Sequence, residues 1–173
     1  MAKDGSMRNA AWACNAVAAL ALSLHAVAQD AKPAPCSAPE HRQFDFWLGD
    51  WEVRGPAGKV AGTNTITLEH NGCVLVEHWK GNGGVTGSSF NVYDTDRKKW
   101  RQTWVDSTGG LLDLEGTFAN QRMTLASAAD PKGSISRITW ERLPDGRVRQ
   151  LWETSSDGGA TWKVAFDGYY SKR

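Results

Sequence analysis

Three short segments of the sequence place an amide or a carboxylate two residues before a tryptophan. These segments are Leu75-x-Glu77-x-Trp79, Trp100-x-Gln102-x-Trp104 and Val148-x-Gln150-x-Trp152. In an extended strand, residues two apart point to the same face of the sheet, so each polar group shares a face with its Trp. An unpaired polar group in a packed core costs roughly 1–3 kcal/mol. The pattern therefore favours a cavity with aromatic walls and a few polar groups, which is the kind of site that holds a small molecule.

The predicted ligand site combines tryptophan walls with amide and carboxylate groups that orient the polar end of a small, partly apolar ligand. Its side chains are Trp51, Glu77, Trp79, Gln102, Trp104, Gln150 and Trp152. The alternative is a filled interior, in which the polar groups pair with one another or with Arg137. A filled barrel would serve as a structural or interaction module of the cell envelope, with no cavity and an apolar patch on its outside.

Catalytic chemistry has less support in the sequence. Glu77 and Asp106 are the carboxylates that would supply a general base in a hydrolase or an isomerase. No GxSxG, HExxH or phosphate-loop motif occurs. We therefore assign no catalytic residue and favour a binding protein over an enzyme, with the carboxylate-dependent enzyme as the alternative.

Metal and cofactor chemistry is not indicated either. After residue 28 the histidines are His41, His70 and His78, and none follows residue 78. Alternation along the strand places His78 on the face opposite Glu77, and therefore outside. No CxxC or HxxxH spacing accompanies the cysteines, so we predict neither a metal site nor a cofactor.

The elements that must position these residues are strands. Runs of six to ten residues alternate with turn sequences such as Asn71-Gly72, Thr108-Gly109-Gly110 and Pro144-Asp145-Gly146. The predicted strands are residues 47–54, 60–69, 73–80, 85–93, 100–106, 111–118, 122–127, 135–142, 148–154 and 161–170. With no helical pattern between them, they predict a single antiparallel up-and-down β-barrel of about ten strands, because closure removes the exposed edges.

Residues 44–53, Phe-Asp-Phe-Trp-Leu-Gly-Asp-Trp-Glu-Val, are the most aromatic stretch of the chain. We interpret them as a plug that leads into the first strand, with one helical or 3₁₀ turn within residues 39–46. Alternation predicts the inward residues of strands 60–69 and 161–170, which are Asn64, Ile66 and Leu68, and Trp162, Val164, Phe166 and Tyr170. The Ser155-x-Asp157-x-Gly159-x-Thr161-Trp162 segment is interpreted as a hairpin turn that Asp157 caps.

The first 28 residues have the features of a secretory signal peptide. Lys3 and Arg8 precede an uncharged, apolar stretch over residues 10–28, and Ala26-Val27-Ala28 has the small-x-small pattern of a cleavage site. We predict an exported protein, periplasmic or secreted, with a flexible leader over residues 29–40 and a barrel domain over residues 41–173. No later stretch is long enough to cross a membrane as an apolar helix.

Two cysteines, Cys36 and Cys73, follow the predicted signal. An even number of cysteines in an oxidising compartment favours a disulfide, with two buried free thiols as the alternative. Closing a loop of about 37 residues would stabilise the fold by roughly 4 kcal/mol on the chain-entropy model.

Charge and length limit the partners of the mature chain. Removal of the signal takes away Lys3, Arg8 and Asp4 from 20 basic and 19 acidic residues and leaves equal numbers of both. A neutral chain of about 145 residues is one domain with no electrostatic basis for holding nucleic acid. We predict a small-molecule partner, no nucleic acid and no membrane, and the sequence sets no oligomeric state.

Five motifs, taken in order, resemble a family of bacterial exported proteins with a domain of unknown function. They are the opening motif at residues 44–53, Gly72-Cys73-x-x-x-Glu77-x-Trp79, Gly87-x-Ser89-x-x-x-Tyr93, Trp100-x-Gln102-x-Trp104-Val105-Asp106 and Gly168-Tyr169-Tyr170. The resemblance covers residues 36–173 and implies a calycin-like barrel, similar to lipocalins, fatty-acid-binding proteins and nitrobindins. It carries over no catalytic residue. Nitrobindins bind haem through a His late in the chain, and this sequence has none there.

Overall fold

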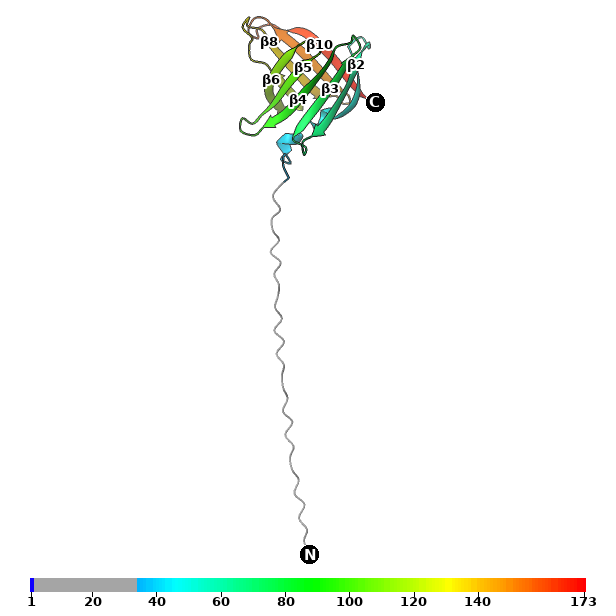
Figure 1. The fold of residues 1–173 in the computed structure, drawn as a ribbon, viewed down its shortest axis with the longest axis vertical. Coiled ribbons are helices and arrows are strands. Elements are labelled where there is room, and N and C mark those ends of the chain that lie inside the picture. The colour runs from blue at the N-terminus through cyan, green and yellow to red at the C-terminus, as the bar shows by residue number, and fades with distance from the viewer. Residues whose placement is uncertain (2–33) are drawn as a thin grey trace. The chain divides into compact units, whose positions relative to one another are not determined.

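The computed structural model describes residue 1 and residues 34–173 (Figure 1). Ten antiparallel strands make up the fold: β1 (Gly49–Arg54), β2 (Val60–Glu69), β3 (Val74–Gly81), β4 (Thr86–Asp94), β5 (Lys99–Asp106), β6 (Leu111–Ala119), β7 (Arg122–Ala126), β8 (Ile135–Arg142), β9 (Val148–Ser155) and β10 (Lys163–Lys172). The predicted signal peptide and the first part of the predicted leader lie outside the described residues. Within the described part, no helix is long and apolar enough to cross a membrane.

The strands close into a barrel in which each strand pairs with its neighbours in the sequence. β1 closes the barrel by pairing with β10, with Val53 opposite Tyr170. The predicted up-and-down antiparallel barrel is therefore confirmed. The bounds of β2 and β8 are those predicted, because turn residues flank both strands. The turn before β3 is built from His70, Asn71 and Gly72, whose φ angles are all positive, a conformation that Asn and Gly adopt most easily.

The first strand is shorter than predicted. Two 3₁₀ turns, η1 (Pro39–Arg42) and η2 (Asp45–Trp47), precede it, so Trp47 belongs to the plug and not to a strand. β1 begins at Gly49, whose φ of +124° is open to glycine and strained for other residues. The predicted 3₁₀ turn is confirmed, and the glycine sets the point where the plug turns into the barrel wall.

The plug fills one end of the barrel with aromatic rings. Phe44 and Trp47 are both completely buried and stack with their ring centroids 5.0 Å apart. Trp140 lies 5.2 Å from Phe44 and 5.4 Å from Trp47, and Trp100 lies 5.6 Å from Phe44. Figure 1 shows η1 below the ends of β3 and β4, where it contacts β4. Aromatic packing thus anchors the N-terminal segment to this end of the barrel.

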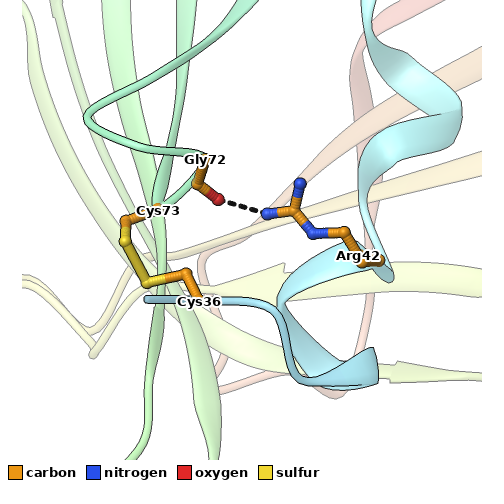
Figure 2. The surroundings of a disulfide bond; sticks show 4 residues. All are labelled: Cys36, Arg42, Gly72 and Cys73. Atoms are coloured by element: carbon orange, nitrogen blue, oxygen red, sulfur yellow. Dashed lines mark hydrogen bonds between the residues drawn. A yellow bond between two sulfur atoms is a disulfide. The ribbon is translucent and has the colours of Figure 1, made fainter. Parts of the chain in front are cut away.

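A disulfide joins the plug to the barrel wall, as Figure 2 shows. Cys36, which precedes η1, is bonded to Cys73, the residue directly before β3, with the two Cα atoms 5.1 Å apart. The guanidinium group of Arg42 donates a hydrogen bond to the carbonyl oxygen of Gly72 in the same turn. The predicted disulfide is confirmed, and the part of the predicted leader that is described is tied to the β2–β3 turn.

β10 departs from the predicted alternation because it contains a bulge. The register with β9 shifts between Val164 and Phe166, which leaves Val164 on the outside with 62% of its surface exposed. Trp162 precedes the strand and also lies outside the barrel, where the Arg137 guanidinium covers its ring at 3.9 Å. The prediction that Val164 and Trp162 face inward is wrong, because the extra residue in the bulge reverses the alternation beyond it.

The remaining predicted faces and turns agree with the structure, with one qualification. Phe166, Tyr170, Asn64 and Ile66 lie inside, whereas Leu68, near the end of β2 beside the β2–β3 turn, is exposed. Asp157 caps the β9–β10 turn by accepting hydrogen bonds from the Thr161 backbone N–H at 2.9 Å and from the Ser155 hydroxyl at 2.7 Å. The hydrogen bond from the Thr161 hydroxyl, together with these two, holds the pKa of Asp157 below its usual range.

Candidate functional site

A cavity of about 210 Å³ occupies the part of the barrel away from the plug. Its lining residues are Glu77, Trp79, Gln102, Trp104, Leu112, Ile138, Gln150, Trp152, Ala165, Phe166 and Tyr170. They come from β3, β5, β6, β8, β9 and β10. The three tryptophans lie toward the C-terminal ends of β3, β5 and β9. Six of the seven predicted ligand-site residues therefore meet at one cavity, which a filled barrel would lack.

Trp51 is the predicted site residue that the structure does not bring to the cavity. Its ring is buried in the core, 6.1 Å from that of Tyr170, and its indole N–H donates to the carbonyl oxygen of Trp47 at 2.8 Å. The Lys172 ammonium covers the ring at 3.9 Å. Trp51 thus connects the plug to the barrel and does not form part of the cavity wall.

Two of the three tryptophans in the cavity wall have indole N–H groups that are hydrogen-bonded to the protein. The Trp104 indole N–H donates to Asp106 at 3.1 Å, and the Trp152 indole N–H donates to the hydroxyl of Ser136 at 3.2 Å. Trp79 packs edge-on against Phe166, with centroids 6.0 Å apart. Hydrogen bonds fix the rings of Trp104 and Trp152, and packing on Phe166 positions that of Trp79, so the cavity offers a ligand a largely apolar surface.

A chain of hydrogen bonds crosses the barrel interior beside these walls. We call its seven residues the polar belt: Gln102, Asn91, Ser89, Glu77, Asn64, Tyr170 and Gln150. At its centre is Glu77, whose side chain is 5% exposed. The Ser89 hydroxyl donates to Glu77 Oε2 at 2.6 Å, and the Asn64 amide donates to Glu77 Oε1 at 2.7 Å. Both carboxylate oxygens therefore accept.

The two arms of the polar belt end at glutamines that line the cavity. On one side, Gln102 Nε2 donates to Asn91 Oδ1 at 2.7 Å, and Asn91 Nδ2 donates to Ser89 Oγ at 2.9 Å. On the other side, the Tyr170 hydroxyl donates to Gln150 Oε1. Within residues 34–173, Gln102 uses only Nε2 and Gln150 uses only Oε1 in side-chain hydrogen bonds, so Gln102 Oε1 and Gln150 Nε2 have no partner. One amide acceptor and one amide donor thus remain for a ligand.

Ser89 and Asn91 are site-supporting residues that the sequence reasoning missed. Both are fully buried on β4, whereas Phe90 between them is 54% exposed. The Gly87-x-Ser89-x-Asn91-x-Tyr93 alternation was the signal for this polar inner face.

Burial controls the ionisation of Glu77. Removal from water raises the pKa of Glu77 above 4.5, and the hydrogen bonds from Ser89 and Asn64 oppose that rise. Burial also raises the pKa of Tyr170, and the neighbouring Glu77 charge adds to the effect. Among residues 34–173, no Lys, Arg or His forms an ion pair with Glu77. The cavity therefore has one carboxyl group with no cation beside it.

Asp106, the other candidate general base, has a different position. Its carboxylate caps the β5–β6 turn and accepts from the backbone N–H groups of Thr108 at 2.8 Å and Gly110 at 3.1 Å. Hydrogen bonds from Thr108, Trp104 and Gly110 lower the pKa of Asp106 to about 2. Asp106 does not line the cavity, so the structure does not bring Glu77 and Asp106 together there.

Residues with metal-binding potential do not gather in the described part of the chain. No group of three or more His, Cys, Asp or Glu residues there could hold a metal ion. His78 is exposed on the outer face of β3, where its ring pairs with the hydroxyl of Ser88 at 3.1 Å.

Because burial raises the pKa of Glu77, the free energy of unfolding should depend on pH. The folded protein holds the Glu77 proton to a higher pH than the unfolded chain does. The free energy of unfolding should therefore fall as pH rises from about 4.5 through the raised pKa, and then level off. Glu77→Gln removes this proton, so its stability relative to the wild type should increase over the same pH range. Urea unfolding from pH 4 to 8 measures the difference.

The groups that face Glu77 should not obscure this pH dependence, and an exposed carboxylate provides a control. Tyr170 is the other titratable group that faces Glu77, and its pKa is raised out of this range. The partners from β2 and β4, Asn64 and Ser89, do not titrate. Glu69→Gln changes an exposed carboxylate at the end of β2 and should leave the pH profile unaltered. A Glu77→Gln profile parallel to that of the wild type would contradict the prediction.

No known family model matches the chain, and the comparison with curated proteins found no match. The resemblance to exported bacterial proteins stays a prediction.

Proposed function

We propose that this protein is an exported barrel that binds a small, partly apolar molecule in its cavity. The observation that carries the proposal is the combination of a cavity, three tryptophan rings in its wall, two of them fixed by hydrogen bonds, and two glutamine amides with unoccupied hydrogen-bonding atoms. Such a combination is unfavourable in a solid core, because a buried polar group without a hydrogen-bond partner destabilises the fold. The Cys36–Cys73 disulfide supports an oxidising compartment and hence export.

The cavity volume sets the size of the ligand. An apolar cavity of about 150 Å³ takes up benzene, with six non-hydrogen atoms. By this scale, a cavity of about 210 Å³ suits a molecule of about eight non-hydrogen atoms. A single ring with a short polar substituent meets this limit, and the long chain of a fatty acid does not.

The glutamines should discriminate between a polar ligand and its apolar analogue. Benzyl alcohol can donate to Gln102 Oε1 and accept from Gln150 Nε2, whereas toluene can do neither. We expect Gln102→Leu with Gln150→Leu to weaken benzyl alcohol binding roughly 30-fold, at about 1 kcal/mol for each hydrogen bond. Toluene binding should stay the same or become tighter. Tryptophan fluorescence titration measures both affinities.

Two controls separate this effect from unfolding. Thr103→Val alters the outer face of β5 next to Gln102 and should leave both affinities unchanged. Thermal unfolding of the double variant should remain cooperative. Unchanged affinity for benzyl alcohol in a folded double variant would remove the glutamines from the site. Native mass spectrometry of protein from its own host's envelope would identify the natural ligand as an added mass that denaturation removes.

A further inference from the structure

The arrangement of donors around Glu77 is suited to a carboxylate. Asn64 and Ser89 each direct a hydrogen-bond donor at one of its oxygens. Asn91 donates to Ser89 in turn, and Gln102 donates to Asn91, so this arm of the polar belt is aligned toward Glu77. Hydrogen bonds to the charged form favour that form. The belt therefore offsets part of the cost that burial imposes on a negative charge at the cavity wall.

Two arginines that neighbour cavity-lining residues in the sequence are paired on the outside of the barrel. Arg137 forms an ion pair with Glu153 at 2.8 Å on the outer face of the barrel. Arg149 pairs with Asp167 at 2.9 Å, also outside. A buried carboxylate without a counter-charge is unfavourable, and a cation that enters the cavity would relieve this cost. An anionic ligand would instead meet the Glu77 charge with no compensating group.

The aromatic walls favour the same sign of charge. Ring faces carry negative electrostatic potential and attract ammonium groups, most strongly at Trp. Three tryptophans line the cavity with Glu77, and the indole N–H groups of Trp104 and Trp152 are engaged by Asp106 and Ser136. A cation beside Glu77 would thus contact tryptophan rings on the sides that do not face the carboxylate.

We propose that the ligand of this cavity is an organic ammonium cation of about eight non-hydrogen atoms, with its charged nitrogen at Glu77 and its apolar part among Trp79, Trp104 and Trp152. This inference rests on the proposed function and narrows its ligand class. The ammonium group supplies the counter-charge that the described part of the chain does not place beside Glu77.

Two probes of equal size test the charge. Benzylammonium and benzyl alcohol have the same number of non-hydrogen atoms and the same ring, and differ in one polar group. At pH 7.5 we expect benzylammonium to bind the wild-type protein at least tenfold more tightly than benzyl alcohol does, by isothermal titration calorimetry. In Glu77→Gln, benzylammonium affinity should fall at least tenfold and benzyl alcohol affinity should change less than threefold. Glu69→Gln, an exposed carboxylate change, should alter neither.

The outcomes distinguish this inference from the proposed function. If benzyl alcohol binds as tightly as benzylammonium or more tightly, the cationic ligand class is wrong and the binding cavity stands. If Glu77→Gln folds and keeps the preference for benzylammonium, Glu77 is not its partner and the inference fails. If neither probe binds at millimolar concentration, the proposed function fails as well. The wild-type comparison uses no variant, so it remains decisive even if Glu77→Gln does not fold.

Discussion

Removal of the Cys36–Cys73 disulfide should lower the free energy of unfolding by about 4 kcal/mol. The bond closes a loop with a sequence separation of 37 residues, and the chain-entropy model gives this size of effect for such a loop. The loop contains the whole plug, β1 and β2, so the open unfolded chain gains freedom over a quarter of the domain. Guanidinium chloride unfolding of Cys36→Ser with Cys73→Ser, followed by tryptophan fluorescence, measures the loss.

Two further observations would identify the cause of that loss. Reduced wild-type protein should match the double variant, because both lack only the cross-link. The denaturant dependence should steepen, since an unfolded chain without the bridge exposes more surface. Benzyl alcohol affinity should stay within about threefold of the wild type, because Cys73 and the cavity lie toward opposite ends of β3. A loss below about 1 kcal/mol would mean that plug packing alone holds the N-terminal segment.

Turn chemistry explains why the barrel itself could be predicted. Asn71-Gly72 and Pro144-Asp145-Gly146 interrupt the chain where the backbone must reverse, and Gly72 and Gly146 both adopt positive φ. Between such turns, residues that favour strands have no helical periodicity to compete with them. The strand count and the antiparallel order follow from these local signals.

The depth of a side chain along the barrel axis could not be predicted in the same way. Trp51 and Trp79 both point inward, yet Trp51 belongs to the core beside the plug and Trp79 to the cavity. Alternation reports the face of a strand, whereas depth depends on how far neighbouring strands are staggered around the barrel. That stagger is a property of the closed sheet, and no single segment encodes it.

The bulge in β10 and the polar inner face of β4 escaped prediction for a related reason. Val164 and Phe166 alternate as inward residues would, but an extra residue between them moves Val164 outside. On β4, buried Ser89 and Asn91 alternate with exposed Phe90, so hydropathy alone indicates the wrong face. The inner face of β4 is polar because Ser89 and Asn91 complete the polar belt around Glu77. Their hydrogen-bond partners, Glu77 and Gln102, lie on other strands, so the β4 segment alone does not reveal them.

Truncation of Trp47 should have an effect as large as loss of the disulfide. The side chain is completely buried, stacks on Phe44 and lies 5.4 Å from Trp140 and 6.4 Å from Tyr170. Trp47→Ala leaves a cavity among rings that the rigid barrel cannot close, so we expect a loss of about 3–5 kcal/mol. Urea unfolding measures it. Trp162→Ala, outside the barrel, is the matched control and should cost less than about 1.5 kcal/mol.

Trp47→Phe separates packing from hydrogen bonding at the same position. The Trp47 indole N–H is buried and has no hydrogen-bond partner, so phenylalanine removes a polar group that already weakens the core. The hydrogen bond from Trp51 ends on the Trp47 backbone carbonyl and survives the change. We therefore expect Trp47→Phe to cost less than half of what Trp47→Ala costs. Equal losses in the two variants would mean that the plug depends on the indole itself and not on the ring area that it buries.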